Sequence, residues 1–333
     1  MSPARRLRGC RIGIVLSAEA RRRPVRRRRD EPSRSLARPR STADAPDPRS
    51  ALEALCRELG AISGLNVRPH VLSSYESLLK RLDWGVIDLA WLPPVVALRA
   101  ITRCGATPIA VPMRGDTSWF WTALFVRPDS PVRALADLAG TRAVWVDPDS
   151  ASGYLMPRAS LSAEGIDPDS TFREEVFASA HDAVVREVLE DPTSVGATFV
   201  HFDDDGHVFR AGWGSERVRL LKTAGPIPAD LLAAASTAPA ELVAAVRRAL
   251  LEGGSEEVVR AAQLLFAATR FTAVERAHLA HLELLGRSLS ALPRRSTPRR
   301  LAPGVLDSRG PPPGPGTVSV RQSLGVLATR KAR

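Results

Sequence analysis

A short polar segment, residues 149–154 with the sequence DSASGY, combines residue types that can hold an anion. It lies between a predicted strand at 142–146 and a predicted helix, and such turns at the carboxyl edge of a parallel sheet bind ligands. Free backbone N–H groups and the helix dipole favour negative charge there. Ser150 and Ser152 add hydroxyl donors, and Gly153 lets the backbone approach closely. The segment suits a tetrahedral oxyanion; the alternative is that Ser150 or Ser152 simply caps the helix.

Two further side chains have a comparable placement in the predicted order of elements. His181 begins a helix that follows a predicted strand, and its imidazole can donate a hydrogen bond to an oxyanion. Tyr75 begins an earlier helix in the same way. His181 taken alone is also typical of a helix cap or a surface histidine. The sequence therefore offers three groups of donors that could converge on one ligand.

The remaining histidines give weaker signals. His201 and His207 flank the acidic turn 203–206, which lacks the spacing of an EF-hand and is predicted to be a solvated turn. His278 and His281 lie three residues apart without an HExxH pattern, so a surface helix face is expected. No metal site or cofactor is predicted. The GxGxxG, GxxxxGK[ST] and GxSxG patterns are absent from the sequence, which disfavours nucleotide-dependent enzymes and elbow-type serine hydrolases.

Alternating strand and helix patterns must position these residues. The predicted strands of the first half lie at 12–16, 65–71, 86–92 and 109–113, with helices at 52–62, 75–82 and after 93–94. A second series of strands and helices follows from about 120 to 221, and residues 229–286 have an entirely helical pattern. Strands that alternate with helices indicate an α/β fold with mostly parallel sheets flanked by helices.

The charge of the chain is concentrated at its ends. The 333 residues carry a net charge of +11, yet the stretch 50–286 is acidic and the basic excess lies before and after it. Residues 21–29 include seven arginines, and 311–316 read PPPGPG. We therefore expect a disordered start at 1–9, an Arg-rich disordered insertion at 17–49 and a basic disordered tail at 287–333. Three widely spaced cysteines, Cys10, Cys56 and Cys104, give no disulfide framework and are expected to be buried or half-buried thiols.

The first 20 residues resemble a secretion signal only in part. Basic residues precede the apolar run 12–16, but an export signal needs about 7–15 apolar residues in this run. The run is therefore predicted to be the first core strand. No stretch of the sequence approaches the roughly 20 apolar residues that span a bilayer.

Taken in order, several short segments resemble the phosphate, phosphite and phosphonate substrate-binding proteins of ABC transporters. The resemblance covers about 10–286, and the collinear series is more specific than any one segment. The segments are 75–79 (YESLL), 85–92 (GVIDLAWL), 124–130 (LFVRPDS), 137–140 (DLAG), 146–155 (VDPDSASGYL), 165–169 (GIDPD), 180–184 (AHDAV), 196–198 (GAT) and 223–228 (TAGPIP).

This resemblance implies a two-lobed fold of the type II periplasmic-binding-protein kind. Lobe one would comprise 10–119 and 222–286, and lobe two 120–221, with the ligand held in a cleft that closes by hinge motion. In the family a tyrosine, a serine-rich turn and a histidine hold the anion. By resemblance these are Tyr75, the turn Ser150–Gly153 and His181.

The sequence departs from the family pattern at three places. The turn usually reads Ser-Thr-Ser-Gly, and Ala151 replaces the threonine. Phe120 stands where a tyrosine is expected near the first crossing between lobes, so both substitutions remove a hydroxyl donor from positions expected to touch the ligand. Ser194 occupies a place where an acidic residue is usual. These changes predict either a smaller, less polar or otherwise different anion, or degenerate binding.

The leading functional hypothesis is a non-enzymatic, monomeric binder of a phosphorus oxyanion that delivers its ligand to an ABC permease. The resemblance implies a periplasmic location, whereas the short apolar run leaves a cytoplasmic one open. The alternatives are a cytoplasmic ligand-sensing or regulatory module on the same fold and an enzyme of cofactor biosynthesis. Binding of nucleic acid through 21–29 is a further alternative, although no nucleic-acid partner is expected from the acidic body.

Overall fold

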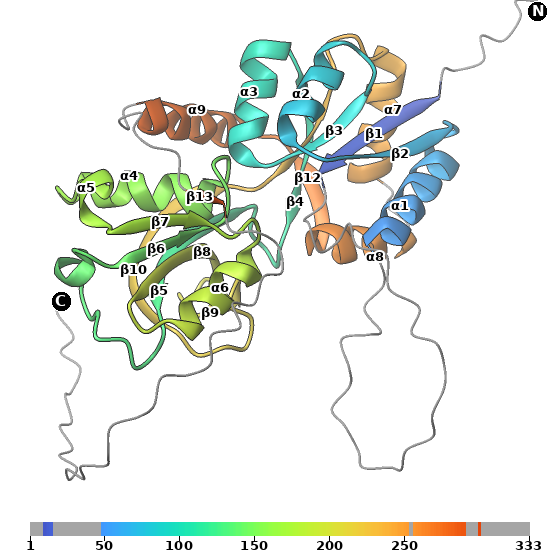
Figure 1. Cartoon of the computed structure of the whole chain (residues 1–333). Helices are drawn as coiled ribbons and strands as arrows, with labels where there is room; N and C mark the ends of the chain where they lie inside the picture. Colours follow the sequence, from blue (N-terminus) through green and yellow to red (C-terminus); the bar gives the residue numbers. More distant parts are fainter. Residues whose placement is uncertain (1–8, 16–47, 253–255, 291–298, 301–333) are drawn as a thin grey trace, which may run out of the picture. The chain divides into compact units, whose positions relative to one another are not determined.

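Two β-sheets organise the residues that the computed structural model describes, namely 9–15, 48–252, 256–290 and 299–300 (Figure 1). The first sheet has the strand order β12-β4-β11-β3-β1-β2. Its strands are β1 (Cys10–Val15), β2 (Val67–Leu72), β3 (Leu89–Leu92), β4 (Thr107–Met113), β11 (Leu231–Ala234) and β12 (Arg270–Ala273).

The second sheet has the order β10-β5-β8-β6-β7-β13, and β9 pairs with β8 outside this path. Its strands are β5 (Trp119–Val126), β6 (Arg142–Trp145), β7 (Glu174–Phe177), β8 (Ser194–Phe202), β9 (Val208–Ala211), β10 (Arg219–Pro228) and β13 (Arg299–Arg300). Strands β6, β7 and β8 run parallel, whereas β5 and β10 are antiparallel to their neighbours.

Helices cover both faces of the first sheet because each has one apolar stripe. In α1, Leu52, Leu55, Cys56 and Leu59 recur at helical spacing and are buried. One core joins α1 (Pro48–Ser63), α7 (Ala240–Leu251) and α8 (Glu256–Phe266) to the sheet. The other core joins α2 (Tyr75–Asp83), α3 (Pro94–Cys104) and α9 (Arg276–Ser290).

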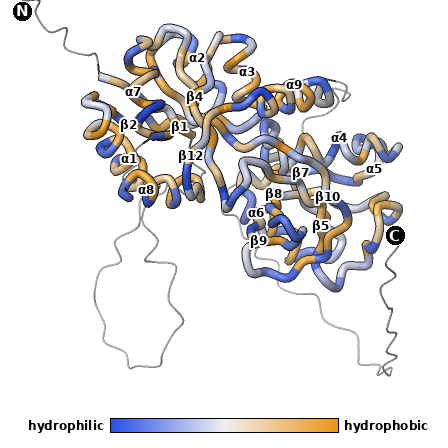
Figure 2. Tube along the Cα trace, turned by 180° about the vertical axis from the view of Figure 1, so that it is seen from behind, coloured by the Kyte–Doolittle hydropathy of each residue, from blue (hydrophilic) through white to orange (hydrophobic). Residues whose placement is uncertain are grey.

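The second sheet also has a core on each face. Leu161 of α4 (Met156–Ala163), with Leu138 of the 3₁₀ turn η2 (Leu135–Leu138), packs on the face that carries Leu124 and Trp145. Helix α6 (His181–Glu190) packs on the opposite face, and the short α5 (Pro168–Thr171) follows α4. Figure 2 shows hydrophobic residues gathered in the strands and hydrophobic and hydrophilic residues alternating along the flanking helices.

The prediction that 229–286 is entirely helical is wrong, because β11 and β12 lie within it. All four residues of β11 (LLAA) are buried between β3 and β4, so this strand has no polar face to produce an alternating pattern. Both added strands pair antiparallel, so the first sheet is mixed, with parallel pairing at β1–β2 and β1–β3.

The chain passes between the sheets at three places, namely between β4 and β5, between β10 and β11, and between β12 and β13. The predicted boundary at 222 falls inside β10, which stays in the second sheet to Pro228. The boundaries of the two lobes as such stay a prediction.

The predicted disordered segments fall mostly outside the described residues. This applies to 1–8, to 16–47 with its arginine run, and to 301–333. Within the predicted tail, α9 continues to Ser290, and β13 pairs in parallel with β7, so those residues form regular structure where none was expected.

The cysteine prediction is confirmed, since Cys10 and Cys56 are buried and Cys104 is half-buried. Burial raises the pKa of both buried thiols to about 12. Among the described helices, none has the length and apolar character needed to cross a membrane.

Candidate functional site

The serine-rich turn forms where β6 ends, at the carboxyl edge of the parallel strands. Ser150 caps the π-helical turn η3 (Ala151–Leu155), which leads directly into α4. The Oγ of Ser150 accepts a hydrogen bond from the Gly153 N–H at 3.0 Å. The capping alternative is thus confirmed for Ser150. A hydroxyl that accepts one bond still has its own proton to donate, so capping does not remove Ser150 as a ligand donor.

Gly153 is required in this turn by space. A Cβ at this position would lie 2.3 Å from the Cγ2 of Val146 and 2.6 Å from its Cβ. The Val146 N–H also donates to the Gly153 carbonyl at 3.1 Å. Only a glycine lets the turn fold back this closely onto the end of β6.

Ser152 and Ala151 are both buried beside strand β5 of the second sheet. Ser152 is buried, and its carbonyl accepts from the Thr122 hydroxyl at 2.6 Å. Among the described residues, the Oγ of Ser152 has no hydrogen-bond partner. Ala151 is buried in an apolar cluster with Phe120 and Ile227. The Ser152 hydroxyl is therefore a donor that no described residue uses. Ala151, in contrast, contributes to apolar packing.

His181 lies on the neighbouring strand end, at the first residue of α6. The preceding Ser179 has φ 69°, a left-handed conformation that is uncommon for serine and reverses the chain into the helix. Its N–H donates to the Val146 carbonyl at 2.8 Å. Val146 therefore bonds to both turns, through its N–H to Gly153 and through its carbonyl to Ser179.

The imidazole of His181 is held neutral. Its Nδ1 lies 2.7 Å from the Oγ1 of Thr198, and its ring meets Phe199 edge-on at 4.9 Å. Burial, and next the charge of Arg210, lower the pKa of His181 to about 4. No side chain caps the helix start at Ala180, so the first N–H groups of α6 are not used by a side-chain cap. If the Thr198 hydroxyl donates to Nδ1, the Nε2–H can donate to a ligand.

Tyr75 and Phe120 are placed less directly. Tyr75 begins α2 after the Ser74 cap and is half-buried against the core of the first sheet. Its convergence with the two turns stays a prediction. Phe120 is buried beside Ala151, and its ring stacks on His201 with centroids 5.9 Å apart. Phe120, which stands where the family pattern has a tyrosine, therefore makes apolar contacts in this protein.

Sequence reasoning missed two residues of this region, His201 and Arg210. His201 is not part of a solvated turn, because it lies in β8 with an exposed fraction of only 2%. Arg210, on β9, is paired directly opposite His201. The alternation of Phe199 and His201 could have placed both on one face of a strand, but the position of Arg210 depends on pairing between strands.

The acidic turn and the helix histidines can now be placed. Asp203, Asp205 and His207 are exposed, and the Asp203 carboxylate accepts from the backbone N–H groups of the other two at 3.1 and 2.7 Å. This agrees with a solvated turn. The surface prediction for His278 is wrong: it is 2% exposed, lies 2.8 Å from the Ser118 Oγ and stacks on Trp119. His278 is buried because α9 packs against Ser118 and Trp119, where the chain enters β5.

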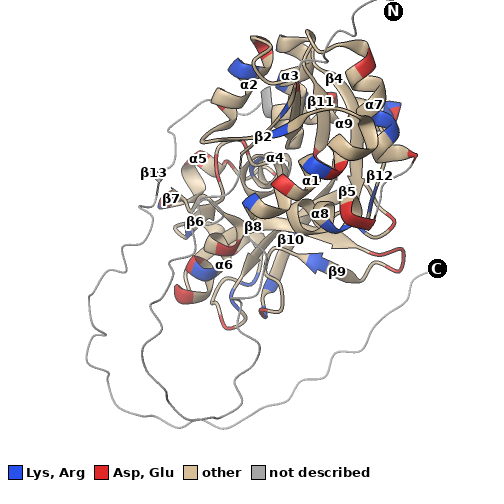
Figure 3. Cartoon of the chain, turned by 90° about the vertical axis from the view of Figure 1, so that its right-hand side faces the viewer, with Lys and Arg blue, Asp and Glu red and all other residues tan. Residues whose placement is uncertain are grey.

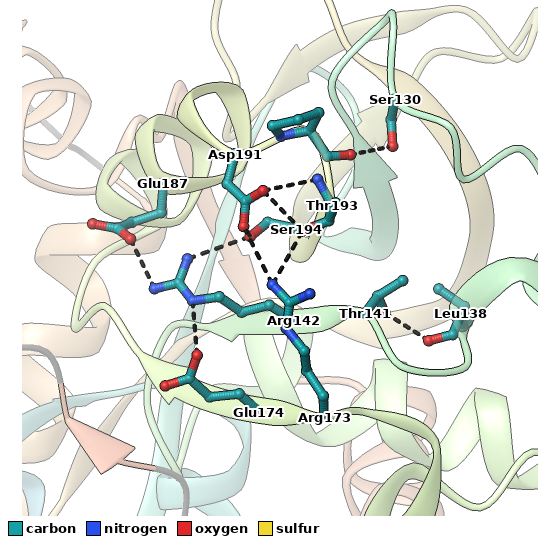
Figure 4. Close-up of polar contacts among 11 residues, drawn as sticks. Ser130, Leu138, Thr141, Arg142, Arg173, Glu174, Glu187, Asp191, Thr193 and Ser194 are labelled. Atoms are coloured by element: carbon teal, nitrogen blue, oxygen red, sulfur yellow. Dashed lines mark hydrogen bonds and ion pairs between the residues drawn. The ribbon is translucent and has the colours of Figure 1, made fainter. Parts of the chain in front are cut away.

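Ser194 is remote from the turns, since it begins β8 at the opposite end of the parallel strands. Figure 4 shows it between Asp191 and Arg142. Its hydroxyl donates to Asp191 at 2.8 Å and accepts from Arg142 at 3.3 Å. Arg142 also pairs with Glu187 and Glu174. This departure from the family pattern therefore lies in a polar network at the end of the strands away from the turns.

Comparisons with known proteins concern the family and the fold. The model of a family described as ABC transporter, phosphonate, periplasmic substrate-binding protein matches residues 41–281. A Xanthomonas citri protein solved with a chloride ion has 19% identity and a TM-score of 0.64, covering 85% of this chain and 98% of that one. No curated protein matches the sequence.

Two further solved structures are similar in fold. One is a binding protein component of an ABC phosphonate transporter from Pseudomonas aeruginosa, with 16% identity, a TM-score of 0.62 and coverage of 86% and 90%. The other is PhnD1 from Prochlorococcus marinus in complex with methylphosphonate, with 15% identity, a TM-score of 0.59 and coverage of 84% and 98%.

Proposed function

This chain belongs to the periplasmic substrate-binding proteins of ABC phosphonate transporters, and from that premise we propose that the two turns bind a phosphorus oxyanion. The chain has the type II periplasmic-binding-protein fold and is a transport protein, not an enzyme. The proposed ligand is a phosphonate, phosphite or phosphate, taken up by cleft closure and presented to the permease as a monomer in the periplasm.

One observation carries the proposal, namely the link that Val146 makes between the two turns. It joins Gly153 and Ser179, so the serine turn and the start of α6 are fixed beside each other on adjacent parallel strands. Both turns offer helix N-termini and neutral donors. A tetrahedral anion has several acceptor oxygens, and backbone N–H groups with hydroxyl and imidazole donors around one point satisfy them together.

The Ser152 hydroxyl gives the sharpest test because it bonds to no described residue. Hydrogen bonds to charged groups contribute about 1.5–3 kcal/mol, so Ser152→Ala is expected to weaken binding at least about tenfold. The unfolding midpoint of the free protein should stay near the wild-type value. Ser162→Ala, which removes an exposed hydroxyl from α4, is the matched control.

Binding is measured by calorimetry and by the ligand-dependent rise in melting temperature, in a phosphate-free buffer. The ligands are methylphosphonate, phosphite and phosphate, with sulfate for comparison. The proposal fails if none of the three phosphorus anions raises the melting temperature at millimolar concentration, or if S152A binds them as the wild type does.

A further inference from the structure

Arg210 lies on the face of the second sheet where Thr122 bonds to the serine turn. Strand register pairs Thr122 with Phe199 and His201 with Arg210, so the side chains of these four residues share one face. Thr122 holds the Ser152 carbonyl, and the guanidinium of Arg210 lies over the Phe199 ring, 4.5 Å from its centroid. The same ring makes a T-shaped contact with the His181 ring, with centroids 4.9 Å apart. One aromatic ring thus contacts both the guanidinium and the imidazole expected to touch the ligand.

The charge of Arg210 has no ion-pair partner among the described residues. Asp230 is the nearest acidic influence, but its carboxylate is engaged with Arg114 at 2.9 Å. Burial, followed by repulsion from Arg114, lowers the pKa of Arg210 to about 10, which still leaves it charged at neutral pH. Half-buried cations without a counterion are uncommon, because desolvation is normally offset by a carboxylate.

His201 adds a second unsatisfied group at the same place. Its residue is 2% exposed, and its Nδ1 is a buried atom with no hydrogen-bond partner among the described residues. The rings of Phe120, Phe199 and Phe209 surround it. Buried polar atoms in proteins are nearly always bonded, so an orphan beside an unpaired cation indicates a ligand-facing surface.

We propose that Arg210 determines the charge selectivity of the oxyanion site, so that the site accepts phosphonates with a neutral or anionic substituent and rejects those with an ammonium group. This inference rests on the proposed function. The turns supply neutral donors that hold the phosphonate head, and Arg210 supplies the fixed positive charge next to them. A ligand ammonium group placed against the Phe199 and His201 face meets this cation and no free carboxylate from the described residues. A carboxylate there would pair with the guanidinium.

The test compares three probes that share the phosphonate head: methylphosphonate, phosphonoacetate and 2-aminoethylphosphonate. Calorimetry at low ionic strength is expected to give wild-type dissociation constants at least tenfold weaker for 2-aminoethylphosphonate than for either other probe. Arg210→Gln should weaken methylphosphonate and phosphonoacetate at least tenfold and reduce the discrimination against the amine. Arg210→Lys keeps the charge and should keep the discrimination. Arg127→Gln removes the same charge from an exposed ion pair with Asp129 and should leave all three affinities unchanged.

The outcomes separate the two proposals. If the wild type binds none of the probes, the proposed function fails. If it binds methylphosphonate but R210Q keeps the wild-type ratios, as R127Q does, only the role of Arg210 is overturned. If the wild type binds 2-aminoethylphosphonate as tightly as methylphosphonate, the charge selectivity is refuted while oxyanion binding stands. Circular dichroism of R210Q establishes that the variant folds, and R210K supplies the comparison if it does not.

Discussion

Gly153→Ala is the substitution that most directly tests how the serine turn is built. The added Cβ would lie 2.3 Å from the Val146 Cγ2 and 2.8 Å from the Ser150 Oγ, whereas ordinary van der Waals contact begins at 3.4 Å. The turn must therefore move away from β6 by about 1 Å to relieve the closest contact. A movement of this size lengthens the 3.1 Å bond between the Val146 N–H and the Gly153 carbonyl beyond bonding range.

Two contributions set the expected loss of stability. Overpacking of a buried position costs about 1–3 kcal/mol, and the loss of one backbone hydrogen bond destabilises by about 1 kcal/mol. The free energy of unfolding of G153A should therefore fall by about 2–4 kcal/mol. Because the displaced turn carries the donors of the site, methylphosphonate should also bind at least about tenfold more weakly, a change of roughly 1.4 kcal/mol.

Urea unfolding followed by circular dichroism measures the first effect, and calorimetry measures the second. Gly9→Ala is the matched control, because its Cβ would meet Asn66 at an ordinary 3.4 Å. A G153A variant with the midpoint and affinity of G9A would refute the close approach to Val146 as the reason for glycine in this turn.

Two other predictions concern buried charge. His181 and His201 have pKa values lowered to about 4 and about 3, chiefly by burial, so the unfolded chain takes up protons near its ordinary pKa of about 6.5 while the folded chain does not. The free energy of unfolding should therefore fall as the pH falls from 7 to 5, by up to about 1.4 kcal/mol per pH unit for each histidine; equal urea midpoints at both pH values would contradict this. Arg158 is buried between Asp169 and Glu175, and R158M should destabilise the fold by about 3–5 kcal/mol because it leaves both carboxylates without their cation. In the same urea experiment, R186M, which removes the cation of an exposed ion pair, should change stability by less than about 1 kcal/mol, and equal effects of the two variants would show that the buried network contributes nothing special.

The parts of the site predicted from sequence are those encoded by local order. Ser150, Gly153 and His181 each follow a strand and precede a helix, and the parallel pairing of β6 and β7 brings both turns to one edge. Strand-to-helix sequence order is sufficient for this inference, since parallel strands end at the same edge of a sheet.

The parts that were missed depend on tertiary burial and register. The LLAA sequence of β11 is compatible with a helix, and only its position between β3 and β4 makes it a strand. His278 looks like a surface residue until α9 packs against Ser118 and Trp119. Arg210 meets His201 only through the antiparallel pairing of β9 with β8. Figure 3 shows α6 carrying residues of both signs. The charges within one element therefore do not indicate which charged side chain lacks an ion-pair partner.

The link at Val146 has a consequence for how the sequence of this protein can change over time. Both of its hydrogen bonds to the turns are made by main-chain atoms, so a different side chain at this position leaves them intact. Among the twenty amino acids only proline would remove one of these bonds, because it lacks the backbone N–H. These two main-chain bonds form the frame of the site, and most substitutions at position 146 leave the frame unchanged. Substitutions around the frame, including those at Ala151, Phe120 and Arg210, leave these two main-chain bonds in place, so new ligand preferences can arise without rebuilding the turns.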